Sequence, residues 1–247
     1  MHEFLLSSTG PCHNRATAGP MPGITACTGT QATSEAAIRN FLRSQTTTTL
    51  WMAAGFTTEF ILALVALALF GTAERGTDIA LQLTARLSFL LFLPAWCGGA
   101  LATLCGPPFD RLRLRAREFG LCFAAAHLVH LGLVVWLCWI GAAPGVATFG
   151  FFGFAALWTY GLALLSIDRL HRAVGHSVWR WLTLVGLNFI ALAFAVDFLR
   201  FPFHADVRYL LGYLPFDGLV IAGLVLRVAA WGFQVYQNRQ NSTSPAH

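Results

Sequence analysis

The sequence predicts an all-α integral membrane protein, a bundle of six transmembrane helices preceded by a disordered N-terminal tail. The chain has 247 residues, of which 56% are hydrophobic and only 11% are charged; charged residues make up about 25% of an ordinary soluble domain. Its apolar residues gather in runs near the roughly 20 residues that a helix needs to cross a bilayer. These runs are continuous, whereas the strands of an outer-membrane barrel alternate apolar and polar residues.

Residues 1–45 differ from the rest of the chain, because Ser, Thr, Gly, Pro and Ala dominate them. The apolar stretch after Met1 is too short, and begins too close to Glu3, for a secretory signal. We interpret residues 1–45 as a disordered cytoplasmic tail, in which Ser34 is a candidate cap for a short helix through Arg43. An over-extended start codon is the alternative interpretation of this segment.

Residues 46–236 contain the predicted transmembrane domain, and residues 237–247 form a short cytoplasmic C-terminal tail. In lipid, every backbone polar group needs a partner within its own segment, so the six apolar spans are predicted to be helices. Short links, such as residues 141–145, make neighbouring helices antiparallel. The six spans are approximately Leu50–Thr72, Arg86–Leu104, Phe119–Ile140, Val146–Leu165, Trp179–Leu199 and Leu210–Phe233.

The positions of the arginines orient this bundle. The chain has no lysine, and Arg111, Arg113, Arg115 and Arg117 all lie in the link between the second and third spans. The positive-inside rule therefore predicts a multi-pass protein of the inner or plasma membrane with both termini in the cytoplasm. Because the arginines lie in short links rather than on one solvated face, nucleic acid is not an expected partner. Membrane lipid is.

His127 and His130 are the leading candidates for a functional site, because polar groups in mid-membrane are costly. Counted from Glu118 at 1.5 Å per residue, they lie about 13 and 18 Å into the bilayer. Their spacing places both on one helix face. A neutral imidazole is a common axial ligand of haem iron, although two histidines on one helix cannot hold both faces of one iron. The structural alternative is that one histidine bonds to a neighbouring helix and the other fills space.

Glu59 in the first span and Arg227 in the sixth are two further intramembrane ionisable residues. Their positions in the two spans lead us to expect similar depths, so a Glu59–Arg227 ion pair is one expectation. The alternative is that Arg227 extends to the membrane surface while Glu59 faces a wet crevice.

Several short motifs resemble those of the ferric reductase-like transmembrane domain, in particular the haem-binding membrane subunits of bacterial methionine sulfoxide reductase systems. An arginine-rich link leads into the third span, where Gly120 is followed ten residues later by His130. The segment Thr84-Ala85-Arg86 is similar to the T-G-R of that family, and the approach to Trp179 is similar to that of its fifth helix. The resemblance covers about Leu50 to Phe233.

This resemblance implies a b-type haem with His130 as a ligand and His127 as an additional histidine. It also implies that Arg115 and Arg117 are candidates for neutralising haem propionates. The chain departs from the family in the fifth span, where Thr183 and Val196 occupy the positions of two family histidines. The cross-helix pair of ligands is therefore missing.

By this resemblance the protein is a membrane oxidoreductase subunit that passes electrons across the membrane to a partner. No flavin or nicotinamide domain is recognisable in the chain, so electrons would come from a separate flavoprotein or from quinone. Two alternatives remain. The first is a non-catalytic scaffold that binds partner proteins and keeps the fold without haem. The second is a proton or small-solute carrier that uses Glu59, His127 and His130 as a polar relay.

Overall fold

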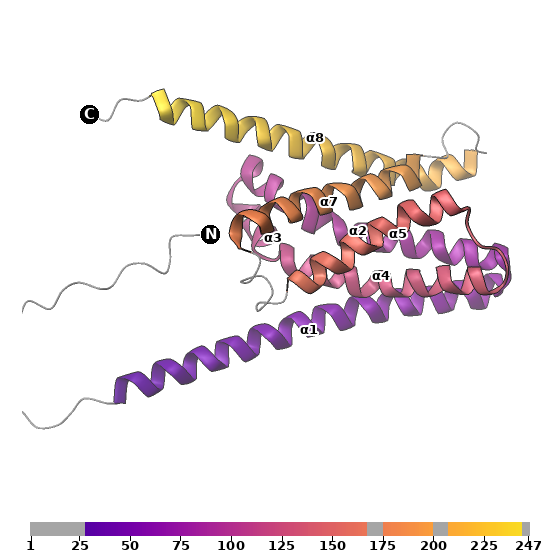
Figure 1. Cartoon of the computed structure of the whole chain (residues 1–247), viewed down its shortest axis with the longest axis horizontal. Helices are drawn as coiled ribbons and strands as arrows, with labels where there is room; N and C mark the ends of the chain where they lie inside the picture. Colours follow the sequence, from indigo (N-terminus) through magenta and orange to yellow (C-terminus); the bar gives the residue numbers. More distant parts are fainter. Residues whose placement is uncertain (1–27, 167–174, 200–206, 244–247) are drawn as a thin grey trace, which may run out of the picture. The chain divides into compact units, whose positions relative to one another are not determined.

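The computed structural model describes residues 28–166, 175–199 and 207–243, and these residues form helices joined by short links (Figure 1). The described part contains no strand, which confirms the all-α prediction. Its elements are α1 (Thr28–Phe70), α2 (Glu74–Cys105), the short 3-10 helix η1 (Pro107–Phe109), α3 (Asp110–Leu114), α4 (Ala116–Trp139), α5 (Val146–Leu165), α7 (His176–Leu199) and α8 (Val207–Thr243).

Six of these helices are long and apolar enough to cross a membrane. The membrane-crossing segments are Gln45–Phe70, Glu74–Cys105, Ala116–Trp139, Val146–Leu165, Ser177–Leu199 and Gly212–Asn241. Large apolar side chains also point outward from them: Leu69 is 72% exposed, Trp139 82% and Val146 91%. A surface of this kind is suited to contact with membrane lipid rather than water. The protein is a multi-pass membrane protein.

Helices α2 and α8 are longer than the sequence predicts. Helix α2 begins at Glu74 rather than near Arg86, because its first turns carry charged residues that lower the hydropathy without breaking the helix. Helix α8 continues to Thr243, so most of the segment predicted as a C-terminal tail is helical.

The chain divides into two units, Met1–Arg43 and Ser44–His247. In the first unit the described residues are those of α1 from Thr28 onward, and residues 28–45 of the segment predicted to be disordered are therefore helical. Residues 1–27 of that predicted tail lie outside the described residues. The second unit contains the membrane-crossing segments.

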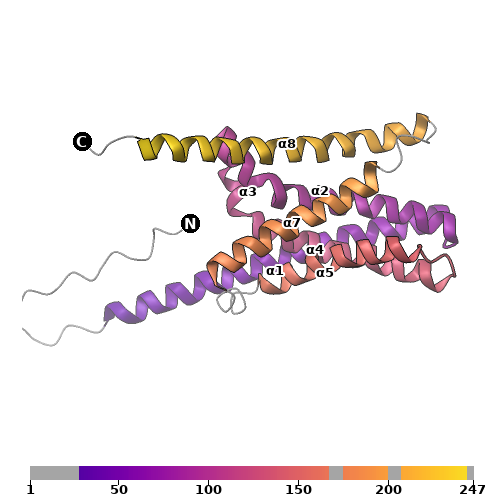
Figure 2. The same cartoon turned by 45° about the horizontal axis from the view of Figure 1, so that its top comes forward.

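Helix α2 is the central helix of the second unit and packs against α4, α7 and α8 (Figures 1 and 2). Its neighbours approach closely where they carry glycine: a Cβ on Gly223 of α8 would collide with the indole ring of Trp96. Phenylalanine rings from α2, α4 and α7 pack against one another. Ring centroids lie 5.3 Å apart for Phe92 and Phe123, and 6.0 Å apart for Phe123 and Phe194.

Helix α1 reverses into α2 at Gly71, whose φ of 88° is a conformation that glycine adopts without strain. Residues 71–73 form the link, and the two helices therefore run antiparallel and side by side. At Gly55, α1 also lies close to α4, because a Cβ at this position would be only 2.6 Å from Sγ of Cys122. This close approach brings the next turn of α1, which carries Glu59, against α2 and α4.

Candidate functional site

Glu59 is fully buried in the membrane-crossing part of α1, with 0% of its surface exposed. The hydroxyl of Ser88 on α2 lies 3.0 Å from Oε1 and 3.0 Å from Oε2, and donates to this carboxyl group. Ser88 is itself 0% exposed. A buried carboxyl group is costly unless it has hydrogen-bond partners, and Ser88 supplies one from a neighbouring helix.

The same hydroxyl contacts His127 on α4, whose Nδ1 lies 3.3 Å from Oγ of Ser88. The distances fit two directions of hydrogen bonding. When Ser88 donates to Glu59, His127 donates to Ser88. When Glu59 carries a proton and donates to Ser88, Ser88 donates to His127. Ser88 therefore connects a carboxyl group on α1 with an imidazole on α4.

His130 extends this arrangement by one turn along α4. Its ring stacks on that of His127, with centroids 5.0 Å apart and planes inclined by 12°. Its Nδ1 lies 3.0 Å from Oγ1 of Thr84 on α2. Thr84 also bonds to the carbonyl oxygens of Ala80 and Leu81, at 2.9 and 3.1 Å. When the hydroxyl proton of Thr84 is used in one of those bonds, the Nδ1–H of His130 is the donor to Thr84.

Glu59, Ser88, His127, His130 and Thr84 thus form one cluster across α1, α2 and α4, here called the polar network. The structure brings three of the residues that the sequence singled out into this network. Both histidines bond to a neighbouring helix, whereas the structural alternative expected only one to do so. Ser88 was missed as a site residue, and Thr84 was noted only for the resemblance. Serine and threonine are common in membrane helices, where they bond to their own backbone. Their presence in a span therefore does not by itself indicate a functional site.

The predicted Glu59–Arg227 ion pair is wrong. The guanidinium of Arg227 donates to the backbone oxygen of Trp96 at 2.6 Å and lies 5.7 Å from the centroid of the same indole ring. Helix α8, which carries Arg227, packs on the side of α2 that holds Trp96, whereas Glu59 faces Ser88. Arg227 therefore joins α8 to α2 and is not part of the polar network.

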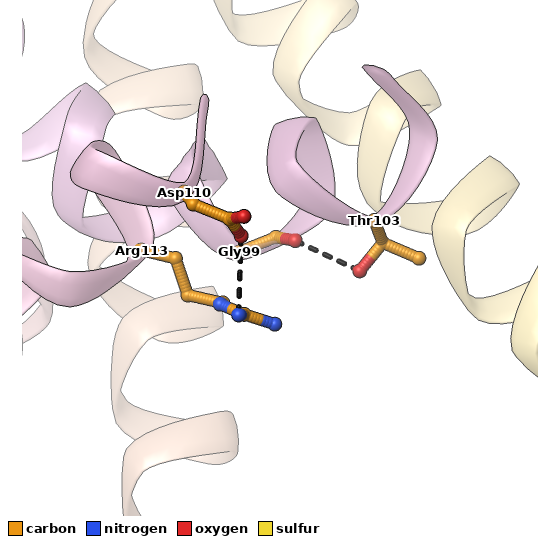
Figure 3. A network of polar contacts seen from close by, with 4 residues as sticks. All are labelled: Gly99, Thr103, Asp110 and Arg113. Carbon is orange, nitrogen blue, oxygen red and sulfur yellow. Dashed lines mark hydrogen bonds and ion pairs between the residues drawn. The ribbon is translucent and has the colours of Figure 1, made fainter. Parts of the chain in front are cut away.

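The basic link before α4 holds the two other predicted site residues. Arg117 donates to the backbone oxygen of Ser166, at the end of α5, at 2.7 Å. Arg115 is exposed at the junction of α3 and α4. Neighbouring Arg113 pairs with Asp110 at 3.1 Å (Figure 3). Neither Arg115 nor Arg117 contacts the polar network in the described part of the chain.

The haem that the resemblance implies would lie between α4 and α7. Rings of Phe123 and Phe194 meet there directly, and the histidines are hydrogen-bonded to α2 instead. Of the two family histidine positions, Thr183 lines a cavity that neither His127 nor His130 reaches, and Val196 is 40% exposed on the outer surface. Within the described residues, no three potential ligands gather to hold a metal ion.

Comparison of this chain with known protein families, curated proteins and solved structures gave no match. The chemistry of the polar network must therefore indicate the function. A carboxyl group, two hydroxyl groups and two imidazoles in hydrogen-bonding distance or ring contact can hold and exchange protons. Ionisable groups in membrane helices commonly mark proton relays and ion pathways.

Proposed function

We propose that this protein transfers protons within the membrane through the polar network. The observation that carries the proposal is that one hydroxyl group, that of Ser88, lies within hydrogen-bonding distance of both Glu59 and His127. A hydroxyl between an acid and a base can receive one proton and release another, so it passes a proton on without becoming charged.

The step can be written with balanced atoms. The O–H bond of protonated Glu59 breaks and its proton moves to Oγ of Ser88. At the same time the original hydroxyl proton of Ser88 moves to Nδ1 of a neutral His127 ring that carries its hydrogen on Nε2. Glu59 becomes a carboxylate, Ser88 stays a neutral hydroxyl, and His127 becomes an imidazolium. The reverse step restores the starting state.

His130 and Thr84 continue the relay toward the end of α2 that carries Glu74. The two imidazole rings are stacked rather than hydrogen-bonded. A proton therefore passes between them through a water molecule or after one ring rotates. Thr84 holds the His130 ring in place through Nδ1, which leaves Nε2 as the nitrogen that exchanges protons.

The proposal is tested by proton flux into liposomes that contain the purified protein and a pH-sensitive dye, with a potassium gradient as driving force. We expect flux above that of empty liposomes, and its loss in Glu59→Gln and Ser88→Ala. Asp217→Asn is the matched control, because Asp217 is a buried acid, 8% exposed, on α8, which packs against α2 and α7. Wild-type flux no higher than that of empty liposomes would overturn the proposal, as would full flux in Glu59→Gln.

The proposal also covers orientation, with both termini on the cytoplasmic face of the inner or plasma membrane. Its support is the positive-inside rule applied to the four arginines of residues 111–117. Cys105 is exposed at the end of α2 near this link. A variant in which Cys105 is the only cysteine should react with an impermeant maleimide in inverted vesicles and not in intact cells. The opposite labelling pattern would reverse the orientation.

Haem-based electron transfer, with a flavoprotein or quinone as donor, stays a prediction of the resemblance. One observation favours it: each imidazole offers Nδ1 to a hydroxyl group, as metal-bound histidines commonly engage their second nitrogen. An absorbance spectrum of protein from haem-supplemented cells tests it. A Soret band that disappears in His130→Ala would support haem. A colourless protein without proton flux would favour the non-catalytic scaffold.

A further inference from the structure

A cavity of about 350 Å³ lies between α2, α4, α5 and α7. One end lies at the membrane boundary, where Arg117 is exposed at the start of α4 and Ser166 follows the end of α5. The other end lies at Phe123 and Thr159. These two residues are six and seven positions further into their helices, which is about 9–11 Å. The cavity therefore leads from the surface toward the interior of the membrane-crossing segments.

The cavity and the polar network share one face of α4. The cavity-lining residues Ala116, Gly120 and Phe123 are spaced four and three positions apart. Residues at these spacings lie on the same side of a helix. His127 and His130 continue the pattern, four and then three positions further along. The network therefore begins one helical turn beyond the inner end of the cavity.

Helix α2 repeats this arrangement. Ala95 and Phe92 line the cavity, and Ser88 and Thr84 belong to the polar network. The four residues are three, four and four positions apart, so they also share one helix face. The cavity and the network are therefore consecutive stretches along the contact between α2 and α4.

Phe92 and Phe123 lie where the cavity gives way to the network, and are here called the phenylalanine pair. Their ring centroids are 5.3 Å apart, and the two residues are 0% and 3% exposed. Both line the cavity. One turn further along α4, the ring of His127 lies 5.4 Å from that of Phe123. Because a phenyl ring carries no donor or acceptor for an ordinary hydrogen bond, contact between the two rings interrupts any chain of hydrogen bonds from the cavity to His127.

We propose that the cavity is the water-filled entrance through which protons reach the polar network, and that the phenylalanine pair is the gate between them. The entrance has this role only if the network transfers protons as proposed above. Hydrophobic constrictions gate membrane pores by excluding water. Rotation of either ring would let water from the cavity reach His127, and return of the ring would separate the two again.

The size and lining of the cavity suit water. Its volume of about 350 Å³ is many times the roughly 30 Å³ that one water molecule occupies in the liquid. Buried water also needs polar partners. The hydroxyl groups of Thr159 and Ser166 donate to backbone oxygens of their own helix, at 3.0 and 2.8 Å. Each hydroxyl oxygen can still accept a hydrogen bond from water.

Proton flux into liposomes tests the gate. Phe123→Ala removes one ring of the pair and should raise the flux severalfold above that of the wild type. The double variant Phe123→Ala/Glu59→Gln should lose this flux, which distinguishes passage through the network from a general leak. Phe198→Ala is the matched control, because Phe198 is an equally buried phenylalanine, 1% exposed, that does not line the cavity. Its flux should equal that of the wild type.

Cysteine reactivity tests for water in the cavity without measuring flux. Thr159→Cys places a thiol in the cavity, whereas Leu157→Cys places one on the outer surface of α5, where Leu157 is 66% exposed. The two positions differ in depth by only about 3 Å. In membranes, and with the native cysteines replaced by alanine, a small methanethiosulfonate should react faster at position 159, because thiolates form in water and not in lipid. A bulkier reagent attached there should lower the flux of a protein that has already folded.

Four outcomes would overturn the proposal: equal thiol reactivity at positions 157 and 159, wild-type flux in Phe123→Ala, undiminished flux in the double variant, or an equal rise in Phe198→Ala. Failure of the proposed function has a different signature, which is no flux in the wild type and in Phe123→Ala alike, and it would remove the gate as well. Size-exclusion chromatography checks that each variant is folded. If Phe123→Ala aggregates, the smaller change Phe123→Leu takes its place and should raise the flux less.

Discussion

The close approach of α1 and α4 at Gly55 allows a quantitative test of how the polar network is held. In Gly55→Ala, the new methyl group would lie 2.6 Å from Sγ and 2.9 Å from the backbone oxygen of Cys122. The backbone oxygen belongs to a helix and cannot rotate away. Helix α1 must therefore retreat by about half an ångström to reach ordinary contact, which begins at 3.4 Å.

This retreat would stretch the hydrogen bonds between Glu59 and Ser88, now 3.0 Å long, to the limit of useful bonding. Overpacking of this kind costs about 1–3 kcal/mol. Each kcal/mol lowers the melting temperature by about 2–4 °C for a protein of this size. We expect Gly55→Ala to melt roughly 2–12 °C below the wild type, and to lose proton flux because α1 carries Glu59.

Thermal unfolding in detergent, followed by circular dichroism, measures the effect. Gly132→Ala is the matched control on α4, because a Cβ at Gly132 has no neighbour within 4 Å. Replacing an unconstrained helical glycine should stabilise the protein by about 0.4–1 kcal/mol. The double variant Gly55→Ala/Cys122→Ala should recover part of the loss, since it removes Sγ but not the backbone oxygen. A melting temperature for Gly55→Ala equal to that of Gly132→Ala would refute the reasoning.

Three further predictions use the same melting assay. Arg227→Leu removes the 2.6 Å bond to the Trp96 oxygen and should cost about 1.5–3 kcal/mol; an unchanged melting temperature would mean that Arg227 extends to the membrane surface instead. Gly223→Ala should destabilise by about 1–3 kcal/mol and shift tryptophan emission, because its methyl group collides with the Trp96 ring. Ser88→Ala deprives Glu59 of its partner and should cost about 1–3 kcal/mol. Combining Ser88→Ala with Glu59→Gln should cost less than the sum of the single changes, whereas strict additivity would show that the two side chains do not interact.

Part of the candidate site could be predicted from the sequence, because the cost of a polar group in lipid depends on its depth in the span. Glu59, His127 and His130 stand out in otherwise apolar runs for this reason. Their partners could not be predicted in the same way. The sequence leads one to expect Glu59 and Arg227 at similar depths, yet Glu59 bonds to Ser88 and Arg227 to the Trp96 backbone, eight residues further along α2. Depth constrains position along the membrane normal and leaves the rotation and neighbours of each helix open.

The residues that line the cavity show the same limit of prediction from the sequence. Arg117 reads in the sequence as an ordinary arginine of a cytoplasmic link, and Thr183 as a departure from the histidine of the resembling family. Only the packing of α4 against α5, and of α5 against α7, brings the two residues to one cavity. Nothing local to either residue signals that arrangement.

The sequence alone determined that this chain is a six-span, all-α membrane protein, because the hydrophobic length of a span and its need for internal hydrogen bonds are properties of each segment by itself. It also singled out Glu59, His127 and His130 as ionisable groups within the apolar spans. The tertiary structure decided that Ser88 joins Glu59 to His127, and that the rings of Phe123 and Phe194 meet between α4 and α7. Those contacts join residues far apart in the chain. They depend on which helices are neighbours and how each is rotated about its axis. Sites of close helix approach such as Gly55 help to fix this arrangement.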